Sequence, residues 1–315
     1  GIGEKLWAAD KCGLSSRANV FRRHVHASQL RSAGFTQRGP DEWDMPAAGT
    51  PQTMDKDEVL EASWWRMVHE DESVNRLSKI TLPSMPQVRK VANFAVVDVL
   101  YYMQARRRQI ILDAVREAVE SALARFRRHH PTYDGAVVLV GHSLGGAILF
   151  DLLRGAQGSS GLAIPQLTFQ PRCLITLGSP TGLFMHCADS VPDVSYCLPG
   201  GARFFNVFHP LDPVAYRIEP LFAEELAKNP PEQVPAVSSR GGLNVSSARR
   251  FFAWATGEDK KSSDEDKGIK YALNGGERVD WALQEEYSML GAAGMAGELL
   301  QALSSHSCYL VSPDV

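Results

Sequence analysis

The stretch VVLVGHSLGGAILF at residues 137–150 constrains the fold more than any other part of the chain. It begins as a short β-branched run, typical of a buried strand, and continues as a helix that Gly155 closes. Between the two, Gly141, Ser143 and Gly145 form a Gly-x-Ser-x-Gly pattern. Glycines on both sides of the serine let a strand and a helix approach closely around a sharp turn. The stretch therefore predicts a nucleophilic Ser143, with an ordinary turn and a serine N-cap as the alternative.

The elements around this turn alternate between helix and strand. Apolar residues at helical spacing, opposite a charged face, predict a helix over 109–130. The segments 171–180 (PRCLITLGSP) and 202–209 (ARFFNVFH) predict two more buried strands. This alternation predicts an α/β fold, with a mostly parallel sheet and helices on both faces. Segments 34–58 and 257–270 are rich in turn formers or charges, so we expect a loop or lid and a solvated insertion.

The composition argues against several classes of protein. The net charge is −3, whereas nucleic-acid binders usually carry a basic excess. Five cysteines without a Cys-x-x-Cys pair argue against zinc and a disulfide framework, and favour a reducing compartment. Neither a signal peptide nor an apolar run of membrane-spanning length is visible. We therefore expect no nucleic-acid partner, and expect contact with a membrane to be peripheral.

The position of Asp212 makes it the candidate acid of a catalytic triad. In α/β-hydrolase folds the triad has the chain order serine, acid, histidine, and the acid follows a later strand. Asp212 comes directly after the strand 202–209, where the active sites of such sheets form. Pro210 and Pro213 flank it and restrict its backbone. Two alternatives remain: Asp193 could be the triad acid, and Asp212 could be a carboxylate that only stabilises a turn.

The same chain order makes His306 the candidate general base. Of the nine histidines, it alone lies downstream of Asp212. Its expected role is to take the proton of Ser143 and pass it to the leaving alcohol, while Asp212 holds the tautomer. A histidine without a catalytic role is the alternative.

Five segments, in chain order, resemble blocks of the DDHD-domain proteins, the intracellular phosphatidic-acid-preferring phospholipases A1. The segments occur in the same order as in that family, and they are 76–102, 137–153, 203–221, 277–285 and 305–314. The resemblance implies an α/β-hydrolase-like lipase core, hydrolysis of the sn-1 ester of a glycerophospholipid, and reversible membrane association. On this basis we divide the chain into a lipase core at 1–180 and a DDHD domain at 181–315. The second part carries the acid, the histidine and the insertion near 257–270.

The resemblance also implies a candidate metal set, Asp212, Asp280, His306 and Asp314, for which the domain is named. Carboxylates and an imidazole are plausible ligands of a divalent cation. A metal on His306 would occupy the lone pair that a general base needs. We therefore favour a triad without a metal cofactor, with Asp280 and Asp314 in supporting or structural roles.

The opening residues, GIGEKLW, resemble a turn that follows the family's first conserved strand and a histidine. The resemblance implies that the N-terminal strand of the sheet is missing from this chain. In α/β-hydrolases an early turn and the residue after the nucleophile supply the N–H groups of the oxyanion hole. We expect Ile2 or Gly3, together with Leu144, to be these donors, with frayed terminal residues as the alternative.

A phospholipid substrate needs a cationic group for its phosphate. Arg217 and Arg203 are candidates because arginine binds phosphate bidentately, and a structural salt bridge is the alternative for each. Membrane contact is a candidate role for Trp64, Trp65 and the basic cluster 106–108. A buried aromatic pair and a solvated helix start are the respective alternatives.

Together these features predict a serine-dependent lipid ester hydrolase, specifically a phospholipase A1 acting on phosphatidic acid or a related glycerophospholipid. A neutral glycerolipid lipase and a catalytically silent lipid-binding or membrane-trafficking scaffold are the alternatives. The expected location is cytoplasmic, at the periphery of intracellular membranes, and the sequence does not identify protein partners.

Overall fold

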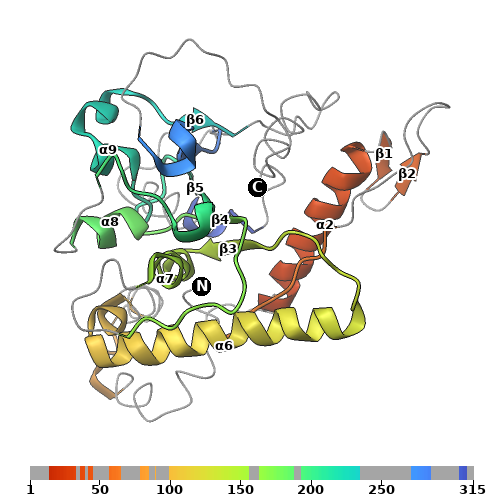
Figure 1. Cartoon of the computed structure of the whole chain (residues 1–315), viewed down its shortest axis with the longest axis horizontal. Coiled ribbons are helices and arrows are strands. Elements are labelled where there is room, and N and C mark those ends of the chain that lie inside the picture. The colour runs from red at the N-terminus through yellow and green to blue at the C-terminus, as the bar shows by residue number, and fades with distance from the viewer. Residues whose placement is uncertain are drawn as a thin grey trace.

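The main element of the fold is a five-stranded sheet in which every pair of neighbouring strands is parallel (Figure 1). The computed structural model describes residues 14–32, 36–39, 42–44, 57–64, 79–84, 89, 99–155, 163–187, 193–234, 271–284 and 305–310. The strand order is β3-β4-β5-β7-β6. The strands are β3 (Val138–His142), β4 (Cys173–Leu177), β5 (Arg203–Phe208), β6 (Glu232–Gln233) and β7 (Asp280–Ala282). The predicted α/β fold with a parallel sheet is confirmed.

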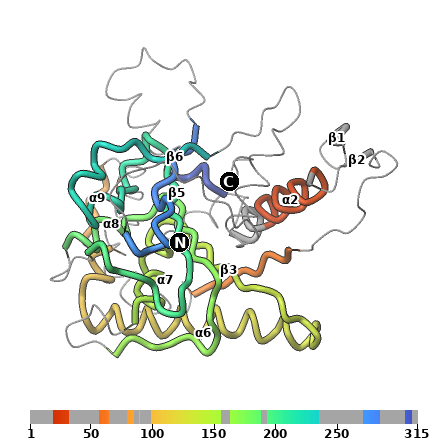
Figure 2. The backbone as a smooth tube through the Cα atoms, turned by 45° about the horizontal axis from the view of Figure 1, so that its top comes forward, coloured from red at the N-terminus to blue at the C-terminus, as the bar shows by residue number. Residues whose placement is uncertain are grey.

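Two helices cover one face of this sheet. Helix α7 (Leu144–Arg154) is buried along its whole length, and the amphipathic helix α6 (Ala105–His129) runs beneath it (Figures 1 and 2). Buried apolar side chains of α6, such as Ile111 and Leu112, pack in one core with Ile148 of α7. Because α7 lies between α6 and the sheet, even its charged residues Asp151 and Arg154 are buried, and Asp151 pairs with Arg108 of α6.

The two faces of the sheet have different partners. Leu174 of β4 and Phe204 of β5 belong to the core that includes α7. Their alternating neighbours, Leu177 and Val207, pack with the fully buried Tyr309 of the 305–310 segment, which contains a helical turn at 305–307. The C-terminal segment therefore reaches the strand ends from the face opposite α7.

The remaining described elements are short or lie outside this sheet, and they are α2 (Leu14–Ser32), β1 (Thr36–Gly39), β2 (Glu42–Asp44), α8 (Thr181–His186), α9 (Glu219–Phe222) and three 3₁₀ helices at Pro199–Gly201, Glu224–Lys228 and Leu273–Gly276. Strands β1 and β2 pair antiparallel within the segment predicted to be a loop, so that part of the prediction is wrong. The backbone pairing overrides the local abundance of turn-forming residues. Helix α2 was not predicted.

Strands from both predicted parts of the chain, 1–180 and 181–315, lie side by side in one sheet. The sheet therefore does not mark the boundary between the two parts, which stays a prediction. The insertion 257–270 lies outside the described residues. Each of the four cysteines in the described ranges is a free thiol. Within those same ranges, no helix combines the length and the apolar character that crossing a membrane requires.

Candidate active site

Ser143 lies at the turn between β3 and α7 and is completely buried. Its backbone has a φ of 55° and a ψ of −131°, a conformation that costs a non-glycine residue about 1–3 kcal/mol. Two backbone hydrogen bonds hold the turn: the Ser143 amide donates to the Leu177 carbonyl (2.9 Å), and the Gly146 amide donates to the Ser143 carbonyl (3.0 Å). The surrounding sheet and helix therefore impose the strained turn on the serine.

Glycines make room for this turn, as the sequence predicts, but the position after the motif matters as well. A Cβ atom on Gly141 would lie 2.6 Å from Cα of Gly146. A Cβ atom on Gly146 would lie 2.7 Å from Oγ of Ser179. Both distances are too short for real carbon atoms, so strand and helix can approach only because both residues are glycine. In the sequence, the signal for this second close approach was Gly146, the second glycine of the pair that follows Leu144.

Asp212 lies in the loop that connects β5 to α9, here called the acid loop and defined as residues 209–218. The Asp212 amide donates to the His209 carbonyl (3.0 Å), and the Val214 amide donates to Asp212 Oδ1 (2.9 Å). These bonds fold the loop back at the carboxyl end of β5 and leave no side-chain surface of Asp212 exposed.

Ser143, His306 and Asp212 form one chain of hydrogen bonds. His306 Nε2 lies 3.0 Å from Ser143 Oγ, and His306 Nδ1 lies 3.0 Å from each carboxylate oxygen of Asp212. An ionised carboxylate only accepts, so Nδ1 carries the imidazole proton and the lone pair of Nε2 accepts the serine hydroxyl. The structure thus brings together the three residues that chain order predicts, in the geometry that an activated nucleophile needs.

Asp212 is held in its charged form despite its burial. Burial alone would raise the pKa of this carboxyl, but hydrogen bonds from His306, from the Tyr309 hydroxyl and from the Val214 amide outweigh it. The pKa of Asp212 is therefore lower than its ordinary value. A charged Asp212 can stabilise the imidazolium that His306 becomes when it takes a proton.

Tyr309 and His142 are two further residues of the site that our sequence prediction did not include. The Tyr309 hydroxyl donates to Asp212 Oδ2 (2.6 Å) and accepts the His209 amide (2.8 Å). His142 Nε2 donates to the His306 carbonyl (2.8 Å). Burial, together with the nearby His306, lowers the pKa of His142 to about 3, so its ring stays neutral. In the sequence, His142 directly precedes Ser143, and Tyr309 follows His306 by three positions. These positions were the signals that could have identified them.

Gly178, which follows β4, is the most crowded glycine of the site, and we expect Gly178→Ala to lower the free energy of unfolding by about 3 kcal/mol. Its φ is 55°, and a Cβ atom there would lie 2.3 Å from Tyr309 Cε2 and 2.5 Å from Asp212 Oδ2. Urea unfolding measures the loss. Gly155→Ala is the matched control, because its φ of 63° is similar and no atom lies within 4 Å. Equal losses in the two variants would contradict the crowding.

The predicted oxyanion donors are described only in part. Leu144 begins α7, directly after Ser143, so its N–H belongs to the first turn of the helix, where amides have no partner within the helix. Ile2 and Gly3 lie outside the described residues.

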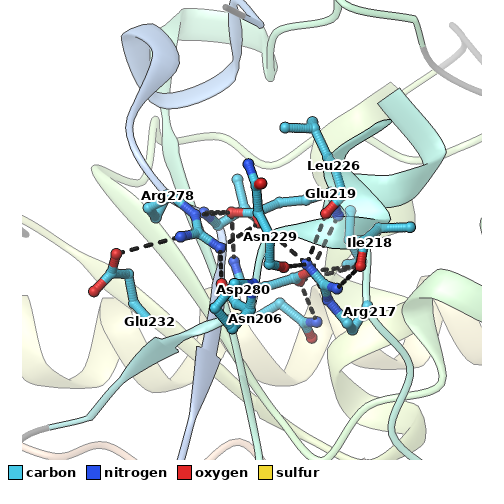
Figure 3. Close-up of polar contacts among 12 residues, drawn as sticks. Asn206, Arg217, Ile218, Glu219, Leu226, Asn229, Glu232, Arg278 and Asp280 are labelled. Carbon is cyan, nitrogen blue, oxygen red and sulfur yellow. Dashed lines mark hydrogen bonds and ion pairs between the residues drawn. The ribbon is translucent and has the colours of Figure 1, made fainter. Parts of the chain in front are cut away.

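The structure favours the salt-bridge alternative for Arg217 over the predicted phosphate binding. Its Nε donates to Asp280 Oδ2 (3.2 Å), and its NH2 group donates to the carbonyl of Asn229 (2.8 Å) (Figure 3). The NH1 group donates to the carbonyl of Ala227 (3.2 Å). Because all three nitrogens are engaged inside the protein, the guanidinium presents no fork to a ligand.

The structure favours the salt-bridge alternative for Arg203 as well. It pairs with Glu277 and begins β5, whereas Asp212 follows the other end of this strand. Six residues of strand separate the two ends by about 17 Å. Arg203 therefore lies at the amino ends of the strands, away from the serine.

Other candidates from the sequence have structural partners. Asp193, the alternative acid, is exposed and accepts the Ser195 amide (2.8 Å) and hydroxyl (2.6 Å). Arg108 of the basic cluster 106–108 pairs with Asp151 (2.5 Å). Trp64 is buried, and Trp65 lies outside the described residues. Trp64 and Arg108 are thus accounted for by packing and pairing within the protein.

The three described members of the candidate metal set, Asp212, Asp280 and His306, are not grouped as ligands of one ion. Asp212 and His306 bond each other, whereas both oxygens of Asp280 accept from Asn206, Arg217 and backbone amides. Cationic and N–H donors on Asp280 occupy the lone pairs that a metal would need. Asp314 lies outside the described residues, and within the described ranges no three His, Cys, Asp or Glu side chains are grouped to hold a metal.

Comparison with known proteins finds similarity to proteins named as phospholipases and as a triacylglycerol hydrolase. The profile of the DDHD domain matches residues 167–253. The chain is 29% identical to a probable mitochondrial phospholipase of Schizosaccharomyces pombe, over 78% of this chain and 39% of that protein. It is 27% identical to an intracellular phospholipase A1 of Caenorhabditis elegans, over 56% of this chain and 27% of that protein.

A third relative carries a different name. The chain is 23% identical to the triacylglycerol hydrolase DDHD2 of Mus musculus, over 82% of this chain and 59% of that protein. The chain therefore spans less than two thirds of each of these three proteins. No solved structure matches the chain.

Proposed function

We propose that the chain hydrolyses lipid esters with Ser143 as nucleophile, His306 as general base and Asp212 as triad acid. The match of residues 167–253 to the DDHD domain supports this proposal. The observation that carries the proposal is the continuous hydrogen-bonded chain from Ser143 Oγ through His306 to the buried Asp212, with both steps at 3.0 Å. A scaffold that only binds lipid has no need of a strained, buried serine with a base in reach.

The reaction proceeds in two halves. His306 Nε2 takes the proton from Ser143 Oγ as this oxygen bonds to the ester carbonyl carbon. The bond from that carbon to the glycerol oxygen then breaks, and His306 returns the proton to the leaving alcohol. In the second half, water gives its proton to His306 and its oxygen to the acyl carbon, and the fatty acid leaves as Ser143 regains its hydroxyl.

Negative charge on the carbonyl oxygen needs N–H donors in both halves of the reaction. We assign one of them to the Leu144 amide at the start of α7, where the helix dipole adds to the hydrogen bond. We assign the other to Ile2 or Gly3. Removal of one such donor typically slows an acyl transfer by about 10²- to 10³-fold.

The proposed substrate is a glycerophospholipid, phosphatidic acid or a related lipid, cleaved at the sn-1 ester. Two relatives named phospholipase support this class, and a relative named triacylglycerol hydrolase supports a neutral glycerolipid as the second candidate. We propose that the protein works in the cytoplasm at the periphery of intracellular membranes, on a phospholipid surface. Neither Arg217 nor Arg203 is assigned to the head group.

We also propose that the chemistry of this chain uses no metal cofactor. The lone pair of His306 Nε2 points at Ser143 and its Nδ1 proton at Asp212, so a metal on either nitrogen would end the proton transfer.

The test of the proposal measures fatty acid release by the full-length protein from phosphatidic acid vesicles and from triacylglycerol emulsions. We expect faster release from phosphatidic acid, a 2-acyl lysolipid as the product, and the same rate with a divalent-metal chelator. Faster release from triacylglycerol would favour the neutral lipase. No release from either lipid would favour the scaffold, and loss of activity on chelation that added metal restores would overturn the metal-free triad.

A further inference from the structure

Asp280 lies at the centre of a buried polar cluster (Figure 3). Its Oδ1 accepts Asn206 Nδ2 and the Ile218 amide, each at 3.0 Å. Its Oδ2 accepts the Glu219 amide and Arg217 Nε, each at 3.2 Å. One carboxylate of β7 therefore binds the backbone where the acid loop ends and α9 begins.

Glu219 returns the same kind of bond to β7. Its Oε1 accepts the backbone amides of Val279 (2.7 Å) and Asp280 (3.2 Å). Arg278 donates to both carboxylate oxygens of Glu219, at 2.9 and 2.8 Å. Each carboxylate thus binds the backbone of the segment that carries the other. We call this reciprocal pair of Asp280 and Glu219 the carboxylate clasp.

Two guanidinium groups balance the charge of the clasp, because Arg217 pairs with Asp280 and Arg278 pairs with Glu219. Burial and the neighbouring Glu219 raise the pKa of Asp280 to about 6. Burial opposes the charge of Glu219 too, but bonds from Arg278 and the backbone amides lower the pKa of Glu219. Removal of one partner from such a buried, mutually dependent set leaves the other charge buried without compensation, which is strongly destabilising.

The clasp holds the carboxyl end of the acid loop, while other bonds hold its amino end. Asn206 links the clasp to the acid loop, because its amide nitrogen donates both to Asp280 and to the Tyr216 carbonyl (2.9 Å). At the amino end, the His209 amide continues from β5 and donates to the Tyr309 hydroxyl. Asp212 lies between these two anchored ends, so its position depends on both.

We propose that the carboxylate clasp positions Asp212 against His306, and that Asp280 acts in the reaction only through this placement, not as a metal ligand or at the substrate. The inference rests on the proposed function for its kinetic part. It also gives Asp280 a role that differs from that of the triad residues, although the metal hypothesis groups it with them.

The test compares three isosteric variants of the full-length protein: Asp280→Asn, Glu219→Gln and, as matched control, Glu232→Gln. Glu232 pairs with Arg278 at the exposed edge of the cluster, so its loss should change little. Amide hydrogen exchange of peptides covering 209–218 reports the loop whether or not the protein is a hydrolase. Steady-state kinetics on phosphatidic acid vesicles, at a temperature where thermal unfolding shows each variant folded, report the reaction.

Both clasp variants should raise exchange in 209–218 by about tenfold or more and lower kcat by about 10- to 100-fold, with KM within about twofold. Their double variant should lose little more than either single one, because each breaks the same device. Glu232→Gln should match the wild type in every measurement. A purely structural role would shift the unfolding temperature without a selective loss of kcat.

Three results would overturn the inference. Loss of kcat in Asp280→Asn without loss in Glu219→Gln would assign Asp280 a direct role. Faster loop exchange with unchanged kcat would separate the clasp from the placement of Asp212. Unchanged exchange in both clasp variants would show that the loop does not depend on them. A wild-type protein that releases no fatty acid would instead refute the proposed function, and the exchange experiment would still decide whether the clasp holds the loop.

Discussion

Ser143→Ala should lower kcat for ester hydrolysis by about 10⁴- to 10⁶-fold, to the level that substrate binding and the oxyanion donors alone support. In the proposed mechanism the hydroxyl is the atom that forms the acyl intermediate, and within the described residues it is the group that lies in hydrogen-bond reach of His306 Nε2. The measurement is fatty acid release from phosphatidic acid vesicles by wild type and variant at equal concentration. Labelling by a fluorophosphonate, which reacts with activated serines, should disappear in parallel.

The control for this variant is Ser195→Ala. Ser195 bonds only the exposed Asp193 among the described contacts and lies in a loop, so its removal should leave rate and labelling unchanged. Activity that survives Ser143→Ala would refute the serine mechanism, because the triad has no second nucleophile.

Asp212→Asn should lower kcat by about 10⁴-fold and leave KM near the wild-type value. The amide has nearly the shape of the carboxylate, but it carries no charge to stabilise the imidazolium of His306. Its NH₂ group would also face donors, since the His306 Nδ1 proton, the Tyr309 hydroxyl and the Val214 amide all point at the carboxylate oxygens. Histidine would then favour the wrong tautomer. Steady-state kinetics with an unfolding curve for the same preparation make the measurement.

Asp193→Asn is the matched control, because Asp193 was the other acid that chain order allowed. Its carboxylate is exposed and bonded to Ser195, so we expect unchanged kcat. A larger loss in Asp193→Asn than in Asp212→Asn would transfer the role of triad acid to Asp193.

The strand-to-helix turn could be predicted from the sequence because its cause is local. Gly141, Ser143 and Gly146 lie within one short stretch, and the contact that requires glycine at 141 is with Gly146. The contact that requires glycine at 146 is with Ser179, and the local sequence does not show it. The apolar strands around it are equally local signals, and they predicted β3, β4 and β5. Strand β7 escaped prediction because its three residues are too few to show a period.

Asp212 and His306 could be named from the order of residues along the chain, a weaker kind of signal. The two residues are 94 positions apart, and their contact depends on how the C-terminal segment packs against the sheet. The same packing brings the Tyr309 hydroxyl to the carboxylate of Asp212. No spacing rule links Tyr309 to Asp212. The aromatic residue three positions after the histidine was visible, but its hydrogen-bond partner was not.

For the two arginines the sequence left phosphate binding and a structural salt bridge both open, and the ion pairs of the folded protein favour the second. Arg217 stands close to the triad acid in the chain, and this proximity suggested a phosphate site. Its actual partner is Asp280, 63 residues away, on a strand too short to predict. A buried charge needs an opposite charge beside it, and for Arg217 this charge is the carboxylate of Asp280.

The sequence by itself determined the elbow around Ser143 and the order in which acid and base follow it, because steric limits at glycine and the chain order of such sheets leave few arrangements. Only the tertiary structure decided which charged groups are free to act and which are paired. Partner choice among charges depends on distances between segments far apart in the chain and on burial. Those quantities exist only in the folded protein, where Asp212 meets His306 and Asp280 meets Arg217.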